Sequence, residues 1–90
     1  MFYIVSYDIP DDRKRNRIAK TLLDFGKRVQ YSVFECIMDD DALESLVKKL
    51  GKIISDDDSV RIYDLCAKCE KSIRVLGTGK VTEDENVYIL

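Results

Sequence analysis

The stretch MFYIVSYDIPDDRKRNRIAKTLLDFG, residues 1–26, carries the signals of a strand followed directly by a helix. Residues 2–7 are mostly β-branched or aromatic, which predicts a strand, and apolar residues at both parities predict that both faces of its sheet are covered. Asp11 or Asp12 can cap the helix that follows, and Gly26 is placed to end it. The chain is therefore expected to open with a β-α unit.

The rest of the chain adds further strands and one helix. Residues 28–38, RVQYSVFECIM, are long for a single strand, so we expect this run to bend or split near Tyr31–Ser32. Apolar residues at helical spacing from 43 to 54 predict an amphipathic helix. Asp39, Asp40 and Asp41 offer N-caps for this helix, and the spacing of Asp41 and Glu44 is that of a capping box. Further strands are predicted over residues 60–66, 72–77 and 86–90.

The order of these elements indicates the fold class. An unsplit second run gives β-α-β-α-β-β-β, and a split run gives β-α-β-β-α-β-β-β. The second order contains the ferredoxin-like β-α-β-β-α-β unit, so we predict an α+β domain over residues 1–78 and a C-terminal extension with an added strand or hairpin over 79–90. Both helices would cover one face of the sheet, and a second copy of the chain is the simplest cover for the other. The fold thus predicts a face-to-face homodimer.

Composition fits one small domain of 90 residues, of which 46% are hydrophobic and 36% charged. The net charge is only −2, but residues 13–28 hold seven basic residues and one acid, whereas residues 39–70 hold nine acids and five bases. No membrane span or secretory signal is visible, and three cysteines suit a reducing compartment, so we expect a cytoplasmic protein without a membrane partner. The absence of histidine excludes His-based catalysis and His metal ligands.

Asp8 stands at the predicted end of the first strand and has two interpretations. It can simply help to cap the following helix. It can also bind a hard cation such as Mg²⁺ or Mn²⁺, which takes one or two carboxylates together with waters and substrate phosphates. One carboxylate provides few protein ligands for a metal ion, but a two-fold axis would bring the Asp8 residues of two chains together.

The basic cluster after Asp8 also has two interpretations. Arg13 and Arg17 lie one helical turn apart and Arg15 flanks them, so they form either a solvated helix face or a track for nucleic-acid phosphates. No base-reading element is evident, which favours positioning contacts over sequence readout. Four aromatic residues could stack on bases, although core packing is the commoner role for most of them: Tyr3, Tyr7, Tyr31 and Phe34.

Cys66 and Cys69 form a single C-x-x-C pair in a predicted turn. They are most simply two thiols without a site role. A redox pair or a zinc ion shared between two chains is the alternative, since a structural zinc site normally needs four ligands.

The stretch YDIPDDRKRNRIAKTLLDFGKRVQYSVFEC, residues 7–36, resembles the signature region of the CRISPR-associated protein two family, the small core protein of spacer acquisition. The matching pieces are the Tyr-Asp-Ile strand end, the Arg-rich helix, Gly26 and the RVQYSVFE run, and residues 61–63 and 66–77 also fit. The resemblance implies a ferredoxin-like fold and a two-fold dimer in which the C-terminal strand, here residues 87–90, crosses to the partner's sheet.

The resemblance also implies a site and an activity. It places Asp8 opposite its two-fold mate across a divalent metal, and it implies a metal-dependent endonuclease for single-stranded RNA or double-stranded DNA. The family's basic and aromatic functional positions fall on Arg15, Arg17, Arg28 and Phe34. Members also act as a non-catalytic adaptor that holds the prespacer duplex and bridges the CRISPR-associated integrase, protein one. Both roles remain open at this point, together with a ferredoxin-like effector domain that does not act on nucleic acid.

Overall fold

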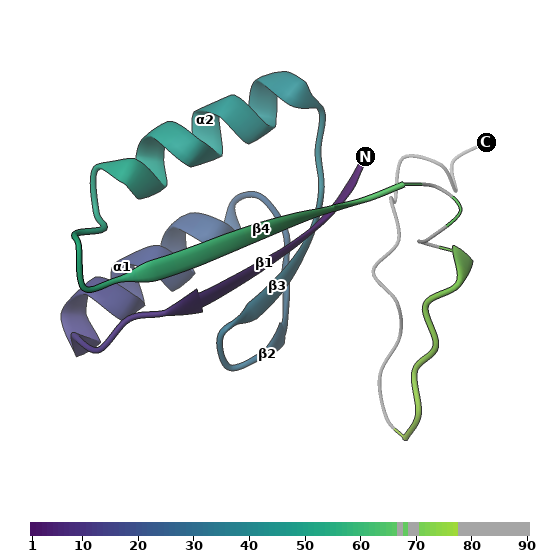
Figure 1. Cartoon of the computed structure of the whole chain (residues 1–90), viewed down its shortest axis with the longest axis horizontal. Coiled ribbons are helices and arrows are strands. Elements are labelled where there is room, and N and C mark those ends of the chain that lie inside the picture. The colour runs from purple at the N-terminus through teal and green to yellow at the C-terminus, as the bar shows by residue number, and fades with distance from the viewer. Residues whose placement is uncertain (67, 69–70, 78–90) are drawn as a thin grey trace.

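The computed structural model describes residues 1–66, 68 and 71–77 of the chain. Its elements follow the order β1 (Phe2–Asp8), α1 (Asp12–Leu23), β2 (Lys27–Gln30), β3 (Val33–Ile37), α2 (Asp40–Gly51) and β4 (Ser59–Leu65). The strands form one antiparallel sheet in the order β2-β3-β1-β4 (Figure 1). The predicted ferredoxin-like β-α-β-β-α-β unit is therefore confirmed, including the split of the second β run.

The core lies between the sheet and the two helices. Tyr3, Val5 and Tyr7 alternate along β1 and share one buried cluster with residues of α1 and α2. Because successive strand residues point to opposite faces, Ser6 and Asp8 lie on the face away from the helices. The helices thus cover one face, as predicted, and within a single chain they leave open the face that carries Asp8. The buried helix residues are Ile18, Ala19, Leu22, Leu46 and Leu50.

Both helices begin at an aspartate N-cap. The Asp11 side chain accepts a hydrogen bond from the backbone N–H of Lys14, and the Asp39 side chain accepts one from Ala42, each at 2.8 Å. The predicted capping box at Asp41 is wrong, because α2 starts before it and Asp41 already belongs to the first turn. An acid in that turn still complements the positive end of the helix.

Gly26 has another role than the predicted helix stop. Helix α1 ends at Leu23, and Asp24 is its C-cap in an ordinary right-handed conformation. A Cβ on Gly26 would lie 2.4 Å from the carbonyl oxygen of Glu35 and 2.4 Å from the Sγ of Cys36. Gly26 is therefore needed for the close approach of the α1–β2 connection to β3.

Of the two strands predicted after residue 66, one is not formed and the other lies outside the described residues. Residues 73–76 form no strand, which corrects the prediction for 72–77, since no strand of the described residues pairs with this segment. The strand predicted over 86–90 and the extension over 79–90 lie outside the described residues. No helix in the described part of the chain is long and apolar enough to cross a membrane.

Candidate metal and nucleic-acid site

Asp8 is the last residue of β1, and its side chain is exposed on the face of the sheet away from the helices. The antiparallel register places Asp8 opposite Ser59 of β4 and Ser6 opposite Arg61. These four residues share one face, because directly paired residues of neighbouring strands point the same way. The register therefore places Arg61 diagonally across from Asp8, two residues beyond its direct partner Ser59.

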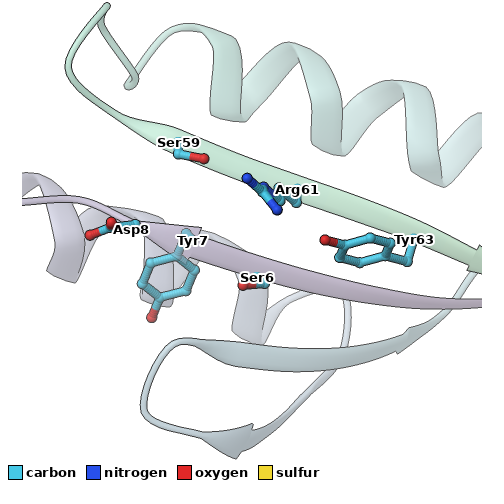
Figure 2. Close-up of a pocket in the computed structure, with 6 residues that line it drawn as sticks. All are labelled: Ser6, Tyr7, Asp8, Ser59, Arg61 and Tyr63. Atoms are coloured by element: carbon cyan, nitrogen blue, oxygen red, sulfur yellow. The ribbon is translucent and has the colours of Figure 1, made fainter.

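These side chains line an open pocket of about 230 Å³ (Figure 2). Arg61 lies between Asp8 and Tyr63 in this view, and a hydrogen bond with the Tyr63 side chain raises the pKa of Arg61 further above its already high ordinary value. The pocket combines one carboxylate, one guanidinium and several hydroxyl groups. Its lining residues are Ser6, Tyr7, Asp8, Ser59, Arg61 and Tyr63.

The pocket offers oxygen ligands, as Mg²⁺ prefers, but only one of them is a carboxylate. Among the described residues, no group of three His, Cys, Asp or Glu side chains could hold a metal ion. Asp11 and Asp12 do not add to the site, since Asp11 caps α1 and Asp12 forms an ion pair with Arg15. One chain thus supplies a single carboxylate and several hydroxyl groups, which are only part of a ligand set for a hard cation.

The basic residues at the start of α1 differ in whether their side chains are free in solvent or bound within the chain. Arg13 and Arg17 have exposed side chains and are open to solvent, as a phosphate track requires. Lys14 is bound instead by Asp58 at 2.8 Å and by Ser55 at 2.7 Å, which ties the first turn of α1 to the α2–β4 turn. Hydrogen bonds from Lys14 and Ser55 lower the pKa of Asp58.

Arg15 is anchored at the β1–α1 connection. Its Nη1 donates to the carbonyl oxygen of Ile9 at 3.0 Å, and its Nη2 pairs with Asp12. The hydrogen bond with Asp12 is the main cause that raises the pKa of Arg15. Part of this arginine's role is therefore to fix the turn that follows Asp8.

Arg28 and Phe34 lie together near the β2–β3 turn. Arg28 donates from Nε and Nη2 to the carbonyl oxygen of Tyr31, at 3.2 and 2.9 Å, and its guanidinium carbon lies 5.5 Å from the Phe34 ring centroid. Phe34 itself is 0% exposed and packs against Tyr7. Direct stacking of Phe34 on a base, which the sequence suggested, is closed in this conformation because the ring belongs to the core.

Sequence reasoning did not single out Arg61, which lines the pocket beside Asp8. Arg61 could be assigned only from the β1–β4 register, which no local pattern fixes. Tyr31 was considered with the other aromatic residues, of which Tyr3, Tyr7 and Phe34 are buried, as predicted for most of the set, whereas Tyr31 is exposed. The Cys66–Cys69 pair cannot be joined to the site, since Cys69 lies outside the described residues.

The comparisons with known proteins agree with one family. The family model described as CRISPR associated protein Cas2 matches residues 1–73. The chain is 44% identical to a protein of Chloroflexus aurantiacus named CRISPR-associated endoribonuclease Cas2 1, and the match covers 100% of both chains. It is similar to the crystal structure of Streptococcus pyogenes Cas2 at pH 6.5, with a TM-score of 0.75, 31% identity and coverage of 86% of this chain and 100% of that one.

A further solved structure concerns an assembly. A chain of a partial Cas6-RT-Cas1–Cas2 complex matches with a TM-score of 0.75 and 28% identity, and the match covers 83% of this chain and 89% of that one. The sequence resemblance and the structural likeness therefore lead to the same family over most of the chain.

Proposed function

The chain belongs to the Cas2 family of CRISPR-associated proteins, and from this premise we propose that it is a dimeric, metal-dependent endonuclease of spacer acquisition. Its substrates would be phosphodiesters of single-stranded RNA or double-stranded DNA. The observation that carries the proposal is the pocket in which Asp8 and Arg61 lie together on the open face of the sheet.

Each pocket residue has a chemical role in this proposal. Asp8 would hold Mg²⁺ or Mn²⁺, which when bound supplies an activated water and neutralises charge on the phosphate. Arg61 would bind a non-bridging phosphate oxygen, because its guanidinium stays charged and its planar donors match oxyanion geometry. Exposed Arg13 and Arg17 would position the neighbouring phosphates of the strand.

A two-fold dimer would complete the partial site. The open face carries half-buried apolar side chains at Ile4, Val33 and Ile37, which a second sheet would cover. It also carries the single carboxylate of the pocket, so a second copy would bring a second Asp8. Two carboxylates at close range repel each other unless a cation lies between them, which supports a shared metal ion.

A nuclease assay with matched variants tests this proposal. Wild type, Asp8→Ala and Asp57→Ala would be incubated with labelled single-stranded RNA and a short DNA duplex, in Mg²⁺, Mn²⁺ or EDTA. Asp57 is an exposed acid of the α2–β4 turn outside the pocket and serves as the control. We expect metal-dependent cleavage by wild type and Asp57→Ala, and at least a hundredfold loss in Asp8→Ala. Equal cleavage by all three proteins would remove Asp8 from the chemistry.

The likeness to a chain of a Cas1–Cas2 complex favours a second candidate function. We propose as the alternative that the dimer is a non-catalytic adaptor, which holds a prespacer duplex and bridges Cas1 integrase dimers. In that case Asp8→Ala would leave spacer acquisition intact in cells, and Arg13→Glu with Arg17→Glu would abolish it. Full acquisition by the double arginine variant would refute the adaptor role of this basic surface.

A further inference from the structure

Tyr31 lies in the turn between β2 and β3 and is 70% exposed, unlike the other aromatic residues near it. Tyr7 and Phe34 are 4% and 0% exposed and belong to the core. Core packing therefore accounts for the positions of the Tyr7 and Phe34 rings, but it does not account for the exposed ring of Tyr31.

The backbone of Tyr31 is held firmly. Its carbonyl oxygen accepts hydrogen bonds from Arg28 Nε at 3.2 Å, from Arg28 Nη2 at 2.9 Å and from the buried Tyr7 hydroxyl at 3.2 Å. A ring presented from a fixed turn loses little conformational entropy when it binds a ligand. The turn thus suits a preformed contact surface.

Two cations flank the exposed ring. The guanidinium carbons of Arg15 and Arg28 lie 5.8 and 5.6 Å from its centroid, and they come from α1 and β2. They still leave most of Tyr31 accessible to solvent. Arginine beside an accessible aromatic ring is the combination by which proteins bind single strands, with phosphates on the cations and bases on the ring.

We propose that Tyr31 stacks on an unpaired base while Arg15 and Arg28 contact the flanking phosphates, so that this turn favours single-stranded nucleic acid over duplex. The inference rests on the proposed function and specifies its substrate class. A duplex keeps its bases stacked internally and offers Tyr31 only its ends, whereas a single strand can turn a base outward. An aromatic contact of this kind is also tolerant of sequence.

A fluorescence experiment tests the stacking directly. A single-stranded oligoribonucleotide carrying 2-aminopurine would be titrated with the full chain in EDTA, which prevents cleavage, and binding would be followed in parallel by anisotropy. Wild type should quench the 2-aminopurine. Tyr31→Leu should lose the quenching and bind the single strand about tenfold more weakly, the size of one base–aromatic stack, with unchanged affinity for a blunt DNA duplex.

Two conservative variants separate stacking from positioning. Tyr31→Phe and Tyr31→Trp retain an aromatic ring and should quench as wild type does, although both lose the tyrosine hydroxyl, which contributes to the raised pKa of Arg15. Loss of quenching in Tyr31→Phe would instead show that the hydroxyl acts through Arg15 and would overturn the inference.

The remaining outcomes distinguish this inference from the function on which it rests. Wild-type quenching and affinity in Tyr31→Leu would refute the stacking role and leave the nuclease proposal standing. Absence of binding by wild type to either nucleic acid, at low salt, would overturn both.

Discussion

Gly26→Ala adds a single methyl group at a position where the structure leaves no room for it, so we expect a clear loss of stability. The new Cβ would lie 2.4 Å from the Glu35 carbonyl oxygen and 2.9 Å from the Cys36 Cα, far inside normal contact distance. Both atoms belong to the backbone of β3, which is paired on both sides and cannot yield locally. Overpacking a core usually costs 1–3 kcal/mol, and contact with fixed backbone atoms places this case at about 3 kcal/mol.

Gly51→Ala is the matched control. Gly51 is the last residue of α2, and an added Cβ there would meet nothing within 4 Å. Alanine in a helix is favoured over glycine by about 0.5–1 kcal/mol, so this variant should be neutral or slightly more stable than wild type. The same chemical change therefore has opposite expected effects at two positions.

Urea unfolding followed by circular dichroism measures both variants. With a slope of about 1 kcal/mol per molar urea for a small domain, Gly26→Ala should lower the midpoint by about 3 M. Because β2 would be displaced from β3, Arg28 and Tyr31 should shift as well, and nucleic-acid binding should weaken in the folded fraction. A Gly26→Ala midpoint equal to that of Gly51→Ala would refute the reasoning from close approach.

Three further predictions concern acid stability, thiol reactivity and the core. Lys14 and Ser55 lower the pKa of Asp58 in the folded protein. The ionised Asp58 carboxylate therefore stabilises the fold at pH values above its ordinary pKa of 3.8, and this stabilisation is lost as the pH falls through the lower folded-state pKa. Melting temperatures measured from pH 2 to 6 should accordingly fall less steeply toward low pH in Asp58→Asn than in wild type. Burial raises the pKa of Cys36 to about 11, so mass spectrometry should find Cys36 unmodified by iodoacetamide at pH 8 in the native protein and alkylated in urea, and rapid native modification would contradict its burial. Leu46→Ala removes a fully buried side chain of α2 and should cost about 2–5 kcal/mol in the same urea assay; a loss below 1 kcal/mol would argue against α2 as part of the core.

Local sequence signals were sufficient for most of the fold. The β-branched and aromatic run of β1, the acids before α1 and the turn at Tyr31–Ser32 each involve residues close in the chain, and the element that each predicted was confirmed. The strand predicted over 72–77 failed because a strand needs a partner to pair with, and pairing cannot be read from a local pattern.

The candidate site depends more on contacts between distant segments. Asp8 could be singled out from its place at a strand end, but its neighbour Arg61 follows from the β1–β4 register. Phe34 and Tyr31 are only three residues apart in the same predicted β run, and the turn between β2 and β3 leaves Tyr31 exposed while Phe34 is buried in β3.

The basic first turn of α1 makes stability and binding depend on each other. The N-terminus of a helix carries a partial positive charge, which disfavours cations, yet Arg13, Lys14 and Arg15 lie there in sequence. The carboxylates of Asp11, Asp12 and Asp58 offset part of the repulsion between these cations and the positive end of the helix. A bound polyanion would relieve the remainder, and any ligand that prefers the folded state stabilises it. We therefore expect the basic residues at this helix end to lower the stability of the unbound protein, and a bound polyanion to restore part of it.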